Sequence, residues 1–179
     1  MILNTTSIRL LTFYFLLGTY LNAFAAPYDV YAVKTAFLYR SLHYVEWRTD
    51  DTATQNSINI CFVHSNKFTD TITSLNKRTI NEFTISLRKI PSYSDTDNCN
   101  VLYISPDNPQ LVSAIISSLK NKNLLTVSDR TGLAAEGVII NFPIDNQKVS
   151  VEINIDAANE HNIKFSAKLL RSAKIFGKN

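Results

Sequence analysis

The residues whose chemistry could be catalytic are scattered along the chain. Asp129, in "TVSDRTG", is the best-placed acid, because it follows a predicted strand and α/β folds place their sites at strand ends. We favour a turn-shaping role for it, before Thr131. Glu152 and Asp156 are interpreted as a strand-surface charge and a helix cap, and His64 as a loop histidine. These residues do not predict a nucleophile, a base and an orienting group at one place.

Cofactor and nucleophile motifs are also missing from the sequence. Its four glycines, Gly18, Gly132, Gly137 and Gly177, build neither a dinucleotide fingerprint nor a phosphate-cradling loop. There is no G-x-S-x-G elbow and no H-E-x-x-H motif. No motif of the sequence therefore supports an enzyme or a bound cofactor, and the family resemblance described below implies a protein that is not an enzyme. A hydrolase without a recognisable motif is the remaining enzymatic alternative.

A basic stripe near the C-terminus points to binding instead. On a predicted helix over residues 167–176, Lys168, Arg171 and Lys174 fall within about 120° of arc. Ile175 lies inside this stripe and would be exposed among cations. A solvated helix face is the simpler interpretation, but this mixture also suits docking on an acidic partner or an anionic membrane surface.

The N-terminal sequence has the pattern of an export signal. An apolar run over residues 10–21 is followed by the small residues of "NAFAAP", and Arg9 is the only charged side chain before Asp29. We expect cleavage after Ala25, which leaves a domain over residues 26–179. A retained membrane anchor is the alternative, although the run is shorter than the roughly 20 residues that span a bilayer.

Export changes the interpretation of the two cysteines, Cys61 and Cys99. An even pair in an oxidising compartment favours a disulfide over two free thiols. Closing such a loop would stabilise the fold by roughly 4 kcal/mol. A metal site is a poorer alternative, because the cysteines and the three histidines show no zinc-type spacing.

Composition and charge indicate one globular domain. The chain has 179 residues, of which 45% are hydrophobic and 18% charged, and its net charge is only +3. That charge is too weak to indicate nucleic-acid binding, which usually needs a clustered basic field.

The longest element is an amphipathic helix predicted over residues 28–47. Its broad apolar side is predicted to hold Val30, Tyr31, Val33, Phe37, Leu38, Ser41, Leu42, Tyr44 and Val45. The opposite side carries Asp29, Arg40, His43 and Glu46. Tyr39, Arg40 and His43 are therefore the outward residues left for a partner. Tyr44 and Trp47 could instead cradle a small aromatic or anionic ligand.

The remaining pattern alternates between helices and strands. Strands are predicted over residues 58–63, 83–90, 101–104 and 124–129, and helices over 67–75, 109–119, 156–161 and 167–176. "GVIINFPIDNQKVSVEINI" predicts an antiparallel hairpin turning at Asp145 and Asn146. Together these elements predict a single layered α/β domain, with a mixed β-sheet flanked by helices and a C-terminal antiparallel hairpin.

Several of these segments resemble a known family. "YAVKTAFLYRSLHYVEW" resembles the opening segment of YfiR-like exported proteins, typically Y-x-V-K-A-A-F-L-Y-N-F-x-K-F-x-E-W. The block from "LLTVSD" to "SAKLLRSAKI" resembles the closing pattern of that family, and "INICFV" and "NCNVLYIS" correspond to its two cysteine-bearing strands. Arg40 and Ser41 replace the usual Asn-Phe pair, and Glu136 replaces the first glycine of the usual Gly-Gly.

The resemblance implies a function. Relatives are periplasmic proteins that repress an inner-membrane diguanylate cyclase by binding its periplasmic sensor region, which lowers cyclic-di-GMP and biofilm formation. They are relieved by an outer-membrane lipoprotein and form dimers. Cys61 and Cys99 match the two family cysteines, which implies a disulfide between them. A periplasmic small-ligand-binding module is the alternative function.

Overall fold

A mixed eight-stranded sheet forms the centre of the protein in a computed structural model that describes residues 28–47, 56–105, 110–120, 122–146 and 148–177. Its strand order is β10-β9-β6-β5-β4-β1-β3-β2. The strands are β1 (Ser57–Phe62), β2 (Thr79–Ile80), β3 (Phe83–Lys89), β4 (Val101–Tyr103), β5 (Leu125–Ser128), β6 (Ile140–Asn141), β9 (Glu152–Asn154) and β10 (Lys174–Phe176). The predicted signal peptide, residues 1–25, lies outside the described residues.

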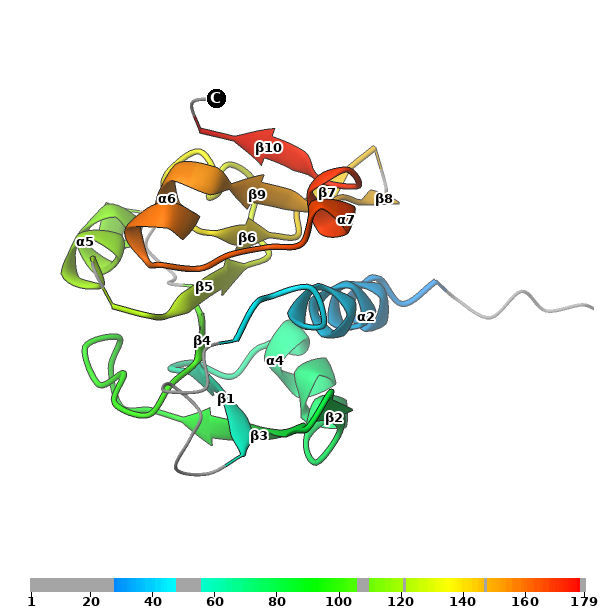
Figure 1. Cartoon of the computed structure of the whole chain (residues 1–179), viewed down its shortest axis with the longest axis vertical. Coiled ribbons are helices and arrows are strands. Elements are labelled where there is room, and N and C mark those ends of the chain that lie inside the picture. Colours follow the sequence, from blue (N-terminus) through cyan, green and yellow to red (C-terminus); the bar gives the residue numbers. More distant parts are fainter. Residues whose placement is uncertain (1–27, 48–55, 106–109, 121, 147, 178–179) are drawn as a thin grey trace, which may run out of the picture.

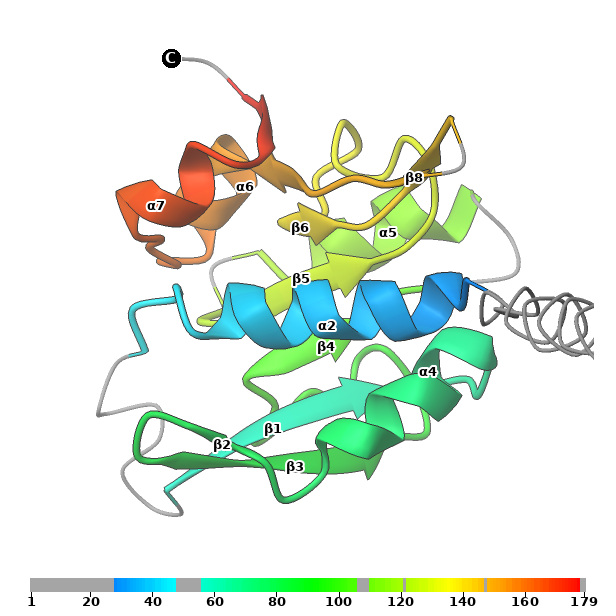
Figure 2. The ribbon, with the colours of Figure 1, turned by 90° about the vertical axis from the view of Figure 1, so that its right-hand side faces the viewer.

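Helices cover both faces of this sheet. They are α2 (Val30–Leu42), α4 (Lys67–Ile72) with the 3-10 turn η1 (Thr73–Leu75), α5 (Gln110–Ser118), α6 (Ile155–Glu160) and α7 (Ala167–Leu170). Figure 1 shows α2 and α4 on one side of the sheet and α5 on the other. In Figure 2, α2 runs across the face of the sheet with α4 beside it. The predicted layered α/β class is confirmed.

Most strands of the sheet run in the same direction, so their carboxyl ends lie along one edge. β3, β1, β4, β5 and β6 are parallel, whereas β2 and β9 run antiparallel to their neighbours β3 and β6. After β1 the chain builds β2 and β3 on one side of it, and then crosses to the other side to form β4. Strand order therefore reverses at the boundary between β1 and β4, and ligands of open α/β sheets commonly bind at the carboxyl ends of the strands at such a point.

The first helix is shorter than predicted and buries a different set of residues. Asp29 caps it, because the carboxylate accepts hydrogen bonds from the backbone N–H groups of Tyr31 and Ala32. Leu38, Ser41 and Leu42 are buried as expected, but five of the predicted inward residues are only half-buried: Val30, Tyr31, Val33, Phe37 and Tyr44. Lys34 and Thr35, which were not predicted to face inward, are buried.

The prediction of a C-terminal helix over residues 167–176 was wrong. Helix α7 ends at Leu170, and Lys174–Phe176 form the edge strand β10, which runs parallel to β9. The backbone N–H of Lys174 donates to the carbonyl of Val151 at 2.8 Å. Short helices are marginal on their own, so pairing with an existing strand outweighs local helix preference. Lys168, Arg171, Lys174 and Ile175 therefore do not form a helical stripe.

The predicted hairpin is present, but it divides into two sheets. Its base is the antiparallel pair β6 and β9 of the main sheet, and its tip is a separate pair, β7 (Ile144–Asp145) and β8 (Lys148–Val149). Asp145 ends β7 and is not a turn residue. Asn146 follows with φ of 46°, in the left-handed region that asparagine tolerates.

The helix cap predicted at Asp156 was also assigned to the wrong residue. Asn154 is the N-cap of α6, and its side-chain oxygen accepts from the backbone N–H of Ala157 at 2.9 Å. Asp156 lies in the first turn, where its negative charge interacts favourably with the helix dipole.

A disulfide joins Cys61 in β1 to Cys99 just before β4, with Cα atoms 5.9 Å apart. Cys61 is fully buried among Ile104, Leu119 and Leu124. The bond therefore ties together the two strands that flank the reversal in strand order. No helix within the described ranges has the length and hydrophobicity needed to cross a membrane.

Candidate functional site

Three of the predicted partner-binding residues line one surface groove. Arg40 on α2, Lys168 on α7 and Lys174 on β10 border a cavity of about 440 Å³. Apolar and small side chains complete it: Phe37, Ser41, Tyr44, Val149, Ser150, Val151, Leu169 and Ser172. We call this cavity the basic groove. Residues about 130 positions apart in the sequence thus meet at one place.

Tyr44 lies beside two of the three cations of the basic groove, Arg40 and Lys168. Lys168 Nζ lies 5.6 Å from the centre of the Tyr44 ring, a cation–π arrangement. Hydrogen bonding by Lys168 and then by Arg40 lowers the pKa of the Tyr44 phenol. Two positive charges therefore lie beside one half-buried tyrosine, in a geometry that suits an anionic group from a partner.

The groove carries little compensating negative charge. None of its lining residues in the described part of the chain is acidic. Glu152, which is outside the lining, lies 3.6 Å from Lys174 and offsets that one cation. The mainly apolar lining between Arg40 and Lys168 would contact side chains as well as charges.

The other predicted partner residues lie elsewhere. Tyr39 donates a hydrogen bond to the carbonyl of Thr79 at 2.8 Å and packs edge-to-face on His43. The Arg78 guanidinium lies over the Tyr39 ring, 5.5 Å from its centre. These side chains belong to the surface near β2. Arg171 and Ile175 are exposed and do not line the groove.

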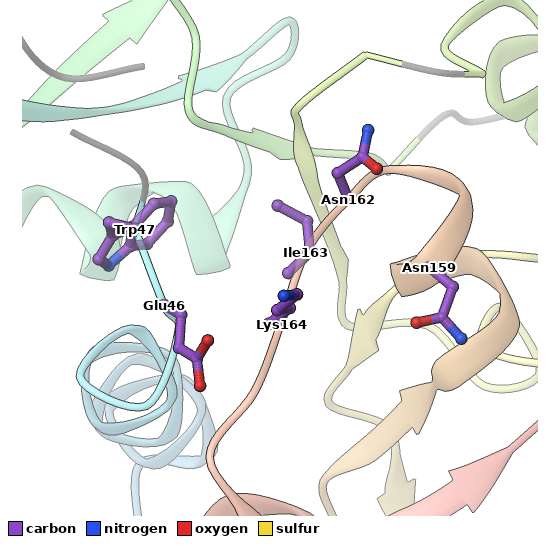
Figure 3. Close-up of a pocket in the computed structure, with 6 residues that line it drawn as sticks. All are labelled: Glu46, Trp47, Asn159, Asn162, Ile163 and Lys164. Carbon is purple, nitrogen blue, oxygen red and sulfur yellow. The ribbon is translucent and has the colours of Figure 1, made fainter. Parts of the chain in front are cut away.

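Trp47 lines a different pocket, of about 570 Å³. Its walls are Glu46, Trp47, Asn159, Asn162, Ile163 and Lys164 (Figure 3). The indole N–H donates to the carbonyl of Leu42 at 3.0 Å, so it is already used within the protein. Figure 3 shows Trp47 and Asn159 on opposite sides, with Ile163 and Lys164 between them. Tyr44 and Trp47 therefore do not form the joint cradle that the sequence suggested.

Sequence reasoning missed a buried polar network beneath the N-terminal end of α2. Lys34 Nζ lies 2.9 Å from Asp129 Oδ2 and also donates to the Asp129 carbonyl at 3.1 Å. The Tyr103 hydroxyl donates to Asp129 Oδ1 at 2.6 Å and accepts from Asn66 Nδ2 at 3.1 Å. Asp129 is thus an ion-pair partner and not simply a turn residue.

Burial determines the charge states in this network. Lys34 is only 2% exposed. Burial, and then the negative charge of Asp129, raise the pKa of Tyr103, so that its hydroxyl stays protonated and donates. The one sequence signal for the network was a lysine on the otherwise apolar side of a helix, followed far along the chain by an aspartate at a strand end.

The fold and its surfaces define a class: a layered α/β protein with a basic groove on its surface. The chain belongs to the YfiR/HmsC-like family, whose sequence pattern matches residues 31–174. Members of this family are periplasmic regulators of diguanylate cyclase signalling rather than enzymes. No curated protein matches the chain.

Two solved structures match the chain, and one of them supports the fold. A conserved domain protein from Vibrio cholerae O1 biovar El Tor strain N16961 is 12% identical with a TM-score of 0.54, and the match covers 82% of this chain and 60% of that one. The ABC domain in complex with L-Trp from Streptococcus pneumonia is 15% identical with a TM-score of 0.48, over 69% of this chain and 56% of that one. The matched region is less than two thirds of either structure, and the first supports the fold alone.

Proposed function

We propose that this protein represses an inner-membrane diguanylate cyclase by binding the periplasmic sensor region of that enzyme with the basic groove. Repression lowers cyclic-di-GMP and biofilm formation. The observation that carries the proposal is the convergence of Arg40 and Lys168 on Tyr44, in a groove without a lining carboxylate. The family supplies the signalling system, and the groove supplies a surface that fits an acidic partner segment.

The mechanism needs no catalytic residue. A regulator that binds one conformation of the sensor region more tightly shifts the cyclase toward that conformation, by no more than the difference between the two affinities. A difference of about 3 kcal/mol between the binding free energies of the two conformations would shift the equilibrium between them roughly 100-fold. An outer-membrane lipoprotein that competes for the regulator would relieve repression. We further propose a homodimer, and export by cleavage after Ala25.

The test uses a strain that has a cyclase with a periplasmic sensor region. Deleting the gene should raise cyclic-di-GMP, and the wild-type gene should restore the low level. Arg40→Glu with Lys168→Glu should fail to restore it, although the protein reaches the periplasm in equal amounts. Lys120→Glu, beyond the end of α5 on the other face of the sheet, is the matched charge control and should restore repression.

Two outcomes would reject the proposal. Unchanged cyclic-di-GMP after deletion would remove the regulatory role. Full repression by the double variant would remove the basic groove as the contact surface, and would leave the surface of Tyr39 and His43, or the edge formed by Arg171 and Ile175, as the next candidates.

A small-ligand-binding module is the second candidate function, and the 570 Å³ pocket beside Trp47 is the observation that favours it. Trp47 is the only tryptophan of the chain, so its fluorescence reports on that pocket alone. A saturable fluorescence change with a small aromatic or anionic compound would support this function. No response across a panel of such compounds would reject it.

A further inference from the structure

The charge of the basic groove is concentrated at one end of α2. Phe37, Ser41 and Tyr44 follow one another along the wall that this helix contributes. Tyr44 lies in the turn after the helix, where its backbone N–H donates to the carbonyl of Ser41 at 2.9 Å. At the rise of an α-helix, Phe37 is about 10 Å from Tyr44 along the axis. Arg40 and Lys168 both lie beside Tyr44, and hence towards the C-terminal end of α2.

The other end of the groove is apolar. In Figure 2, β8 lies towards the N-terminal end of α2, and α7 lies towards its C-terminal end. Val149 of β8 and Phe37 of α2 both line the groove and are only half-buried, so both keep apolar surface in water. A ligand chain that covers this surface would be bound by the hydrophobic effect.

The charged end offers donors that suit a carboxylate. Lys168 Nζ lies 5.6 Å from the centre of the Tyr44 ring, and Tyr44 is also the neighbour of Arg40, so that a phenol and not a carboxylate lies between them. The third cation of the lining, Lys174, has an acidic partner, because its Nζ lies 3.6 Å from Glu152 Oε1. Ammonium and guanidinium groups form their strongest hydrogen bonds with oxyanions.

The size of the groove suits a small molecule. Its volume of about 440 Å³ is within the range of small-ligand sites, which are roughly 300 to 1,000 Å³. A ligand that complements both ends must be negative at one end and apolar along the rest of its length. A fatty carboxylate of medium chain length has this character.

We propose that the basic groove also binds a medium-chain fatty carboxylate, and that the bound molecule excludes the protein partner. The carboxylate lies between Arg40 and Lys168, and the chain runs past Phe37 towards Val149. The exclusion of the partner rests on the proposed function of the groove, whereas binding of the carboxylate does not.

Calorimetric titration of the oxidised, mature protein with decanoate tests the binding, below the concentration at which decanoate forms micelles. Decanol has the same chain without the charge, and acetate has the carboxylate without the chain. We expect saturable binding of decanoate and at least tenfold weaker binding of the other two. Octanoate, which is shorter by two methylene groups, should bind about fourfold more weakly, because an open groove covers only part of each methylene.

Variants assign the binding to the basic groove. Arg40→Gln with Lys168→Gln should weaken decanoate binding about 20-fold, since the carboxylate loses two charge-assisted hydrogen bonds. Val149→Thr, which keeps the shape of the side chain, should weaken it about threefold because the chain meets a hydroxyl. Lys120→Gln, a surface lysine beyond the end of α5 on the other face of the sheet, should leave the affinity within about twofold.

Exclusion of the partner is measured separately, by surface plasmon resonance with the periplasmic sensor region of the cyclase. Saturating decanoate should lower the apparent affinity of the wild-type protein for this region at least tenfold. The same concentration of acetate, which matches the ionic strength, should leave the affinity unchanged.

Three results would overturn the fatty-carboxylate site: no saturable binding of decanoate, equal affinities for decanoate and decanol, or an unchanged affinity in the double glutamine variant. Binding of decanoate with an undiminished affinity for the sensor region would overturn the exclusion. Unchanged cyclic-di-GMP after deletion of the gene would reject the proposed function, but the calorimetric titration would still decide the ligand site. Failure of one proposal is therefore distinguishable from failure of the other.

Discussion

Lys34 and Arg40 lie two turns apart on the same helix and carry the same charge, but their surroundings are opposite. Lys34 is buried, forms an ion pair with the Asp129 carboxylate and donates a second hydrogen bond to the Asp129 backbone carbonyl. Arg40 is exposed at the rim of the basic groove, where its neighbour is a tyrosine and not a carboxylate. The N-terminal part of α2 is therefore held by a buried ion pair, whereas its C-terminal part exposes a positive charge to solvent.

The difference teaches how one helix can serve both stability and recognition. Breaking a buried ion pair is costly because the remaining charge loses its partner away from water. An exposed charge contributes little to folding and remains available to a partner. The structure thus predicts that variants at the two ends affect different measurements.

The largest expected effect on stability comes from the disulfide. It joins β1 to the segment before β4, in the sheet on which both ends of α2 pack. Cys61→Ala with Cys99→Ala should lower the free energy of unfolding by about 4 kcal/mol, because the bond closes a long loop in the unfolded chain. Urea denaturation measures this loss. Reduction of the wild type should reproduce it, and a loss below about 1 kcal/mol would show that the bond is not structural.

Lys34→Met tests the anchored end directly. We expect a loss of about 3 kcal/mol in the free energy of unfolding, since Asp129 keeps its charge without the ammonium partner. Arg40→Met on the same helix is the matched control, and its effect should stay within about 0.5 kcal/mol. Equal effects in the two variants would remove the distinction between the ends of α2.

Salt should separate the two ends further. Raising ionic strength from about 0.05 to 0.5 M should weaken binding of the cyclase sensor region about tenfold, because exposed groove charges are screened. Surface plasmon resonance at both salt concentrations measures the affinity. The unfolding free energy should change little over the same range, since the Lys34 ion pair is buried. A salt-independent affinity would show that the basic groove does not bind through charge.

The smallest effect is a pH dependence from His161, a buried residue outside both regions. Burial lowers the pKa of its imidazolium in the folded state from the usual 6.5. In the window just below 6.5 the unfolded chain therefore binds more protons than the folded one, so stability falls as the pH is lowered and recovers as it is raised.

Urea denaturation between pH about 7 and 5 measures this dependence. His161→Gln should flatten the part of the slope below 6.5, whereas the exposed His43→Gln should keep the wild-type slope. An equal slope in wild type and His161→Gln would assign the pH dependence to other groups.

Much of the fold could be predicted from the sequence, and the candidate site only in part. Strong periodicity placed α4, α5 and strands β1, β3, β4 and β5 close to their observed bounds, and it found α2 but ended it five residues too late. Arg40 and Lys168 were both selected as partner residues, but on two predicted helices whose relative position the sequence did not show. Their meeting around Tyr44 depends on how α7 packs against α2, which local periodicity does not encode.

The C-terminal segment shows where sequence reasoning failed. The helical spacing of Lys168, Arg171 and Lys174 is real as a pattern, but the segment is too short for periodicity to decide its structure. Pairing of Lys174–Phe176 with β9 decided it instead. Edge strands of two or three residues leave little local signal, and the two-residue strand β2 was missed for the same reason.

The sequence by itself determined the family, the order of the main helices and strands and the pair of cysteines, because each of these is written in neighbouring residues or in residue types. Only the tertiary structure decided that Lys34 pairs with Asp129, 95 residues away, and that Arg40 faces Lys168 across a groove. Such contacts depend on the packing of elements that are distant in the chain. The charge of each lysine or arginine was therefore known from the sequence. Whether that charge is buried in an ion pair or exposed to a partner was not.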